Sequence, residues 1–348
     1  MDVFQAGKRN RLGRVYSTIM YRRTGVFRLC LAAAILAPAA WSQSPIFRFH
    51  TDEFWLNLHH FLYVLGRAEN KTTDAAREAV SGAPGEAEKA LASMPEKDAA
   101  QWRAAVEAYA KGLSRKDAIF DEAMFSVTLA LAATGDAASP QEAKIDPAVA
   151  RVLESAAPVY RKTWWAAHRE SNQKWRQKTQ EQVDKHGRAV LAYITRAYGM
   201  EWPAQGFPVH VSAYSNWAGA YSTRGNLLVV ASRPPSSPVA NLESVFHEAM
   251  HQWDPEMRIV LREQAGKLGR RVPQSLSHAL IFFTAGEAVR KLFLDYVPIA
   301  ESAGVWNRGM AHFPPVLREV WKPYLDGKGS RDEALSAVIA AFPADPPR

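Results

Sequence analysis

The hydrophobic periodicity of the chain changes near Gly199–Pro203, and this change most constrains its fold. Before it, apolar residues recur at helical spacing, as in the segment after Thr51. After it, segments 208–214, 217–223 and 227–231 have the short alternating or apolar patterns of strands, with a turn at 224–226 between the last two. The sequence therefore predicts an α+β protein that is mostly helical, with a small antiparallel sheet.

A second helical region is expected after the strands. The proline-rich segment Arg233–Pro238 forms a rigid linker, and Asn241 is a good N-cap for a helix that runs through Trp253. Further helices are predicted near residues 254–269, 276–296, 314–325 and 330–342. We divide the chain into a leader over 1–42, a helical region over 43–199 and a second region over 200–348.

The leader has the pattern of a secretory signal with its core at about 20–42. Arg22, Arg23 and Arg28 precede a short apolar run, and small residues near Ala40 offer a cleavage site. Cys30, the single cysteine, lies inside this run, so the mature chain would contain no thiol and no disulfide. We expect an exported protein, periplasmic or secreted, with membrane contact only if the leader is retained as an anchor.

The excess of basic residues also belongs to the leader. The whole chain has a formal charge of +8, of which residues 1–42 contribute +6 and the remainder only +2. The mature chain therefore lacks the strong basic character that nucleic-acid binding requires, and we expect no nucleic-acid partner.

The chemistry is expected at His247-Glu248-Ala249-Met250-His251. Residues at i and i+4 lie on one face of a helix, so both imidazoles can bind one ion. Glu248 follows the first ligand and can act as general base toward a water molecule at the metal. Neutral imidazole nitrogens bind Zn²⁺, which is the expected cofactor.

The order of strands, a linker and then this motif resembles that of the zincin metallopeptidases. The resemblance covers only about 200–296, and it implies that region 200–348 is a zincin-like catalytic region. The metzincin subclass is excluded because Met257 stands where its third histidine would be. The resemblance therefore implies a gluzincin-like site, in which a glutamate on a later helix is the third ligand.

Glu287 is the predicted third ligand because it is a carboxylate inside an apolar run, where an unpaired charge is costly. Its alternatives are pairing with Arg290 or Lys291, or exposure to solvent. His278 is its competitor, and both could serve only if a helix over 278–287 were broken, since nine residues turn about 900°. His278 and Tyr296 are also candidate donors to the transition state.

Several other polar residues are assigned smaller roles. The adjacent His59 and His60 point to different faces of a helix, so we expect surface or capping histidines and no shared ligand role. Asp254 or Asp295 could orient an imidazole, and Glu243 is expected to be solvated.

The segment 215–221 is the candidate substrate strand. Its small residues would let a peptide backbone approach, and Asn216, Trp217 and Tyr221 are the possible contacts. The leading hypothesis is an exported zinc-dependent metallopeptidase that acts on a peptide or protein. The alternative is a zincin-fold metal-binding envelope protein without peptidase activity, which would act as a binding or scaffolding module.

Overall fold

The computed structural model describes residues 44–72, 74, 81–135, 137–223 and 227–343. The predicted leader lies outside the described residues, as does the turn at 224–226. The described residues belong to one compact unit, Ser44–Arg348. Within them, no helix combines the length and hydropathy needed to cross a membrane.

The described elements are mostly helices, as the sequence predicts. The α-helices are α1 (Phe54–Glu69), α3 (Ala83–Leu91), α4 (Glu96–Lys111), α5 (Glu122–Thr134), α6 (Pro147–Thr163), α7 (Trp165–Tyr198), α8 (Pro238–Met250), α9 (Asp254–Lys267), α10 (Leu276–Arg290), α11 (Ile299–Ser302), α12 (Phe313–Val316), α13 (Lys322–Leu325) and α14 (Arg331–Ala340). Shorter helical turns are Leu113–Arg115, Pro140–Ala143, His251–Trp253 and Leu317–Trp321. The strands are β1 (Phe47–His50), β2 (Phe207–Ser212), β3 (Ala220–Thr223) and β4 (Leu227–Ala231).

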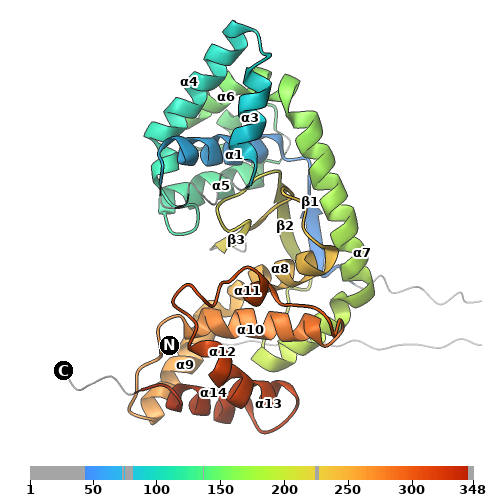
Figure 1. Ribbon diagram of the computed structural model, residues 1–348, viewed down its shortest axis with the longest axis vertical. Helices are drawn as coiled ribbons and strands as arrows, with labels where there is room; N and C mark the ends of the chain where they lie inside the picture. Colours follow the sequence, from blue (N-terminus) through green and yellow to red (C-terminus); the bar gives the residue numbers. More distant parts are fainter. Residues whose placement is uncertain (1–43, 73, 75–80, 136, 224–226, 344–348) are drawn as a thin grey trace, which may run out of the picture. The chain divides into compact units, whose positions relative to one another are not determined.

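The sheet is mixed, so the prediction of an antiparallel sheet is wrong. Among the described residues its order is β1-β2-β4-β3 (Figure 1), with β1 parallel to β2 and β2 parallel to β4. Only β3 runs antiparallel, against β4. The error has a physical cause, because β1 comes from the region predicted to be helical. It pairs Phe47 with Phe207, and no local sequence pattern predicts a contact between residues so far apart in the chain.

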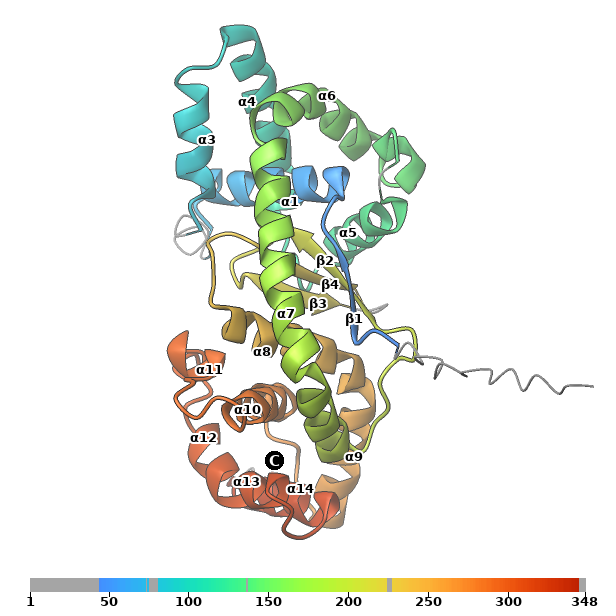
Figure 2. The ribbon, with the colours of Figure 1, turned by 90° about the vertical axis from the view of Figure 1, so that its right-hand side faces the viewer.

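Both faces of the central strands β2 and β4 are buried. On β4, Leu228 and Val230 join the core that contains α7, α8 and α10, whereas Leu227 and Val229 join the core of α1, α4, α5 and α6. Figures 1 and 2 show the sheet between α1 and α8. A strand buried on both sides is expected to be continuously apolar, and the sequence Leu-Leu-Val-Val of β4 has this property.

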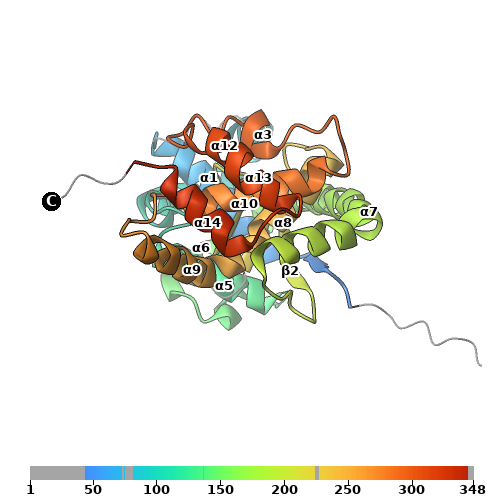
Figure 3. The ribbon, with the colours of Figure 1, turned by 90° about the horizontal axis from the view of Figure 1, so that it is seen from below.

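The C-terminal helices belong to the core that contains α7, α8 and α10. Figure 3 shows these helices from below. Helix α10 packs against α8 and α7, and α14 packs against α9. Helix α7 ends where Gly199 adopts a positive φ of 64°, which a glycine accepts without the steric cost of a side chain. This packing fixes α8 and α10 side by side, and it is these two helices that carry the candidate site.

Candidate metal centre

Helix α8 presents the two histidines of the motif. It begins earlier than predicted, because Pro238 occupies the first turn and the Ser237 side chain accepts a hydrogen bond from the Ala240 backbone N–H at 3.1 Å. The α-helix ends at Met250, but His251 keeps helical dihedral angles and opens the next turn. The rings of His247 and His251 therefore stay on one face, with centroids 5.1 Å apart.

The third histidine is supplied by α10. The ring centroid of His278 lies 5.5 Å from that of His247 and 4.9 Å from that of His251. One potential ligand atom from each of the three residues lies within 4.8 Å of the other two. The packing of α10 on α8 thus assembles three imidazoles that are separated by up to 31 positions in the sequence.

Burial keeps two of these imidazoles neutral. The pKa of His247 falls well below its usual value because the ring is buried and faces two other imidazoles. Burial and the neighbouring His251 lower the pKa of His278 to about 4. Neutral imidazole is the form that binds a metal ion, so both rings are ready to act as ligands at neutral pH.

The imidazole of His251 is oriented by Asp254, one of the two carboxylates proposed for this role. Its Nδ1 lies 3.5 Å from Oδ2 of Asp254, and Ser277 donates a hydrogen bond to the other oxygen of that carboxylate. Burial opposes protonation of His251, but Asp254 and Glu248 outweigh it and raise the pKa. Burial also opposes ionisation of Asp254, yet His251 and Ser277 lower its pKa to about 2. Asp295, the other proposed carboxylate, is exposed.

Glu248 lies beside the histidines and is held from the sheet. Ser222, on the edge strand β3, donates a hydrogen bond of 3.0 Å to Glu248 Oε2. Burial raises the pKa of Glu248, although His251 and Ser222 act in the opposite direction. Sequence reasoning missed Ser222, because a lone serine in a short strand carries no signal of a partner 26 residues away.

The structure does not bring Glu287 to the imidazoles. Its carboxylate lies in the last turn of α10 and forms ion pairs with Arg290 at 3.0 Å and Lys322 at 3.5 Å. Because α10 is unbroken between His278 and Glu287, the two side chains point to different sides of the helix. His278 thus takes the place that was predicted for Glu287.

Tyr296 contacts a different carboxylate, Glu243. The prediction that Glu243 is solvated is wrong: it is fully buried and accepts hydrogen bonds from the Ile299 backbone N–H at 3.1 and 3.2 Å. Burial raises the pKa of Glu243 to about 7 despite these bonds and the nearby tyrosine. Burial and Glu243 in turn raise the pKa of Tyr296.

The three residues proposed to contact substrate separate into two groups. Tyr221 points into the core, where its hydroxyl lies 2.7 Å from Nε2 of His60. Asn216 and Trp217 lie before β3, in a turn where the Asn216 side chain accepts a hydrogen bond from Ala218 N–H at 3.0 Å.

The expectation that His59 and His60 are surface or capping residues is wrong, since both are fully buried.

The geometry of the three histidines suits a zinc ion. A tetrahedral zinc with Zn–N bonds of about 2.0–2.1 Å separates its ligand nitrogens by about 3.4 Å, and the potential ligand atoms here lie within 4.8 Å of one another. Within the described part of the chain, Nδ1 of His247 is buried without a hydrogen-bond partner. Three imidazoles leave a fourth position for water or substrate, as catalytic zinc sites require.

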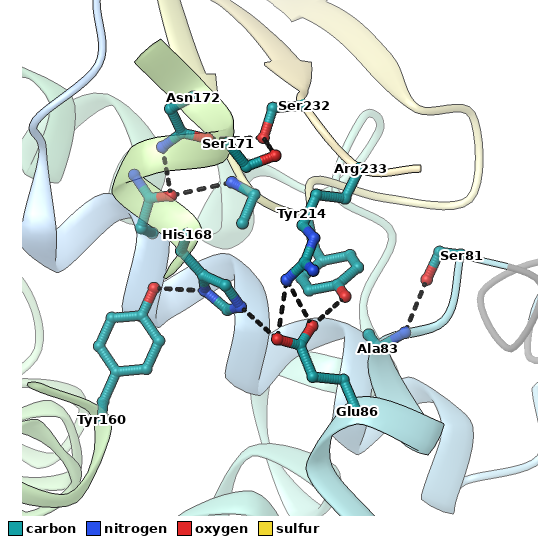
Figure 4. A network of polar contacts seen from close by, with 12 residues as sticks. Ser81, Ala83, Glu86, Tyr160, His168, Ser171, Asn172, Tyr214, Ser232 and Arg233 are labelled. Atoms are coloured by element: carbon teal, nitrogen blue, oxygen red, sulfur yellow. Dashed lines mark hydrogen bonds and ion pairs between the residues drawn. The ribbon is translucent and has the colours of Figure 1, made fainter. Parts of the chain in front are cut away.

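A second cluster of histidine and glutamate lies on the other side of the sheet. Glu86 on α3 accepts hydrogen bonds from Tyr214 and from Arg233 Nη1, the latter at 2.7 and 2.8 Å (Figure 4). Nε2 of His168 lies 3.4 Å from the same carboxylate, and its Nδ1 lies 2.8 Å from the Tyr160 hydroxyl. This cluster ties α3, α7 and the segment after β4 together.

Comparison with protein-family models, curated proteins and solved structures gives no match to this chain. The functional argument therefore depends on the site itself.

Proposed function

We propose that this protein is an exported zinc-dependent hydrolase of peptide bonds, with His247, His251 and His278 as metal ligands and Glu248 as general base. The observation that carries the proposal is the convergence of three imidazoles beside a buried carboxylate. A group of histidines alone would support metal binding, whereas the adjacent carboxylate adds the proton acceptor that hydrolysis needs.

The residues of the site can divide the reaction between them. A bound zinc ion would polarise the substrate carbonyl and make water a stronger nucleophile at neutral pH. Glu248 accepts the proton of the attacking water and later delivers it to the leaving amine. The hydrogen bond from Ser222 holds one carboxylate oxygen in place and leaves the other to receive the proton.

The resemblance to zincin metallopeptidases supports the choice of peptides as substrates. His247-Glu248-x-x-His251 lies on a helix that follows the sheet, and an edge strand, β3, contacts the general base. The third ligand that we propose is a histidine, so the site departs from the gluzincin pattern that implied Glu287.

Metal analysis of the purified protein tests the ligand set. We expect about one zinc per chain in the wild type and in Glu248→Gln, and a near-complete loss of zinc in His247→Ala and His278→Ala. Glu287→Ala is the matched control and should retain the metal. Loss of zinc in Glu287→Ala with retention in His278→Ala would overturn the assignment.

Peptide hydrolysis tests the reaction. Wild-type protein loaded with zinc should cleave a mixed peptide library, and Glu248→Gln should not. A protein that binds zinc through the three histidines yet cleaves no peptide would favour the alternative, a metal-binding envelope protein with a binding or scaffolding role.

A further inference from the structure

A small cavity lies at the carboxyl ends of β2 and β4, outside the histidine group. Its volume is about 170 Å³. Its lining residues include Ser215, Asn216, Trp217, Arg233 and Pro234. Loops that follow neighbouring parallel strands meet at one edge of a sheet, which is where such sheets commonly bind ligands. No acidic residue is among the described residues that line the cavity.

Two buried polar groups of the lining have no partner in the described part of the chain. The Asn216 side chain is fixed because Oδ1 accepts a hydrogen bond from Ala218 N–H, but its Nδ2 donates to nothing. The Ser215 hydroxyl is likewise unpartnered. Both residues are more than nine-tenths buried, and an unsatisfied buried donor is costly. A ligand that offers hydrogen-bond acceptors would remove this cost.

Arg233 gives the cavity its only charged side chain among the described lining residues. Nη1 contacts both oxygens of Glu86, while Nε and Nη2 make no hydrogen bond to the described residues. The guanidinium is also about one-third exposed. It can therefore keep its pair with Glu86 and still donate two hydrogen bonds to a second carboxylate.

We propose that this cavity binds the carboxylate of a small acid or of a peptide C-terminus. Asn216 Nδ2, the Ser215 hydroxyl and the free N–H groups of Arg233 supply donors, and Trp217 and Pro234 supply an apolar wall. The volume admits a group the size of N-acetylglycine, since a cavity of about 150 Å³ holds a benzene molecule.

The cavity is close to the start of the edge strand, which connects it to the proposed active site. Gly219 lines the cavity, and Ser222, three residues later, contacts Glu248. At about 3.3 Å per residue the two positions are about 10 Å apart. The connection to the active site, unlike the carboxylate site itself, rests on the proposed peptidase function. A bound C-terminus would then place the cleaved bond about three residues from the end of the substrate.

A binding experiment tests the carboxylate site without any catalysis. The His251→Ala protein is titrated with N-acetylglycine and with its neutral analogue N-acetylglycinamide, and ligand-observed NMR measures both affinities. We expect the acid to bind about ten-fold more tightly or better, because hydrogen bonds to a charged group are stronger. Equal affinities, or no binding of the acid, would overturn the proposal and leave a cavity that holds only water.

Asn216→Asp is the decisive variant. It retains the oxygen that accepts from Ala218 N–H but replaces the free donor with a negative charge. We expect it to weaken N-acetylglycine binding about ten-fold or more, whereas Asn307→Asp, the same change at an exposed position, should not. Ser215→Ala should weaken binding several-fold and serves if Asn216→Asp fails to fold. Unchanged affinity in folded variants contradicts the assignment.

A cleavage experiment then tests the connection to the active site. Peptides with free C-termini should be cleaved near the third bond from the end, and amidation should lower kcat/KM about ten-fold. Carboxylate binding without such cleavage would refute the connection while the cavity remains a carboxylate site.

Discussion

The Glu86 cluster and the His247–His251–His278 group lie on opposite faces of one sheet, and each combines histidine with a nearby glutamate. In the first, Glu86 has three donors around it, and these outweigh its burial and lower its pKa to about 2. In the second, three imidazoles face one another, and the pKa of the adjacent Glu248 is raised by burial. One cluster satisfies its charges internally, and the other does not.

This difference separates a structural role from a chemical one. A carboxylate surrounded by hydrogen-bond donors is held in its ionised form, so it is a poor proton acceptor. A buried carboxylate with a raised pKa is a stronger base. In addition, the buried Nδ1 of His247 has no hydrogen-bond partner among the described residues. Substitutions in each cluster, and at the carboxylates near them, test this difference.

Glu248→Gln should abolish most hydrolysis. Removal of a general base lowers the rate by about 10²–10⁴-fold, and because glutamine keeps the contact with Ser222, the metal content should not change. Steady-state kinetics beside metal analysis would check both. Glu86→Gln serves as the control from the other cluster and should keep full activity toward C-terminally amidated peptides, which do not engage Arg233. An equal loss in both variants would contradict the difference between the clusters.

Glu243 is another buried carboxylate and should make stability depend on pH. Its pKa is raised from 4.5 to about 7, so the folded state holds the proton more tightly, and this contribution is complete below about pH 4.5 and lost as the pH rises through 7. Glu243→Gln should therefore raise the free energy of unfolding at pH 8 by roughly 3 kcal/mol, with little gain at pH 4.5. Urea unfolding at both pH values measures it, and a gain that is the same at both would contradict burial of the ionised carboxylate as its cause.

Asp254→Asn should weaken the metal site without removing a ligand. Loss of a partner that orients a ligand histidine lowers metal affinity about 10–100-fold. Competition with a zinc chelator would measure the change. Arg258→Gln is a neighbouring control, since Arg258 pairs with the Asp254 carboxylate at 3.5 Å. A larger effect there would indicate that charge, and not orientation of His251, is the cause.

Glu86→Gln should destabilise the fold modestly and leave the metal site intact. The pair with Arg233 is partly exposed, so after solvent screening we expect a loss of about 1–2 kcal/mol at pH 7. Because the folded-state pKa is lowered, this stability is present above about pH 4.5 and is lost as the pH falls toward 2. The difference in the free energy of unfolding between the wild type and Glu86→Gln should therefore be smaller at pH 3 than at pH 7.

Local patterns predicted the elements of the site better than its long-range partners. The strand at 227–231 is confirmed, and the motif lies on a helix as expected. Glu287 was chosen because its apolar neighbours indicated burial, which is correct. Its partner Lys322, however, lies 35 positions further along, and no local signal links the two.

The same limit explains the sheet and the buried histidines. The pairing of β1 with β2 joins residues 160 positions apart. Parallel strands cannot be joined by a tight turn, so no local turn signal marks their pairing. His60 was assigned to a surface because its neighbour points elsewhere, whereas its partner Tyr221 lies on β3. Sequence patterns report which residues are buried, but the identity of their contacts depends on the tertiary fold.

The burial of β4 on both faces has a consequence for proteolytic processing of this protein. Release of the chain between β1 and Tyr198 by a protease would uncover Leu227 and Val229 and would remove the helix that anchors Tyr221. The adjacent Ser222 would then lose the support that aims it at Glu248. If the protein is a peptidase as proposed, we expect removal of residues 47–198 to inactivate it and not to activate it.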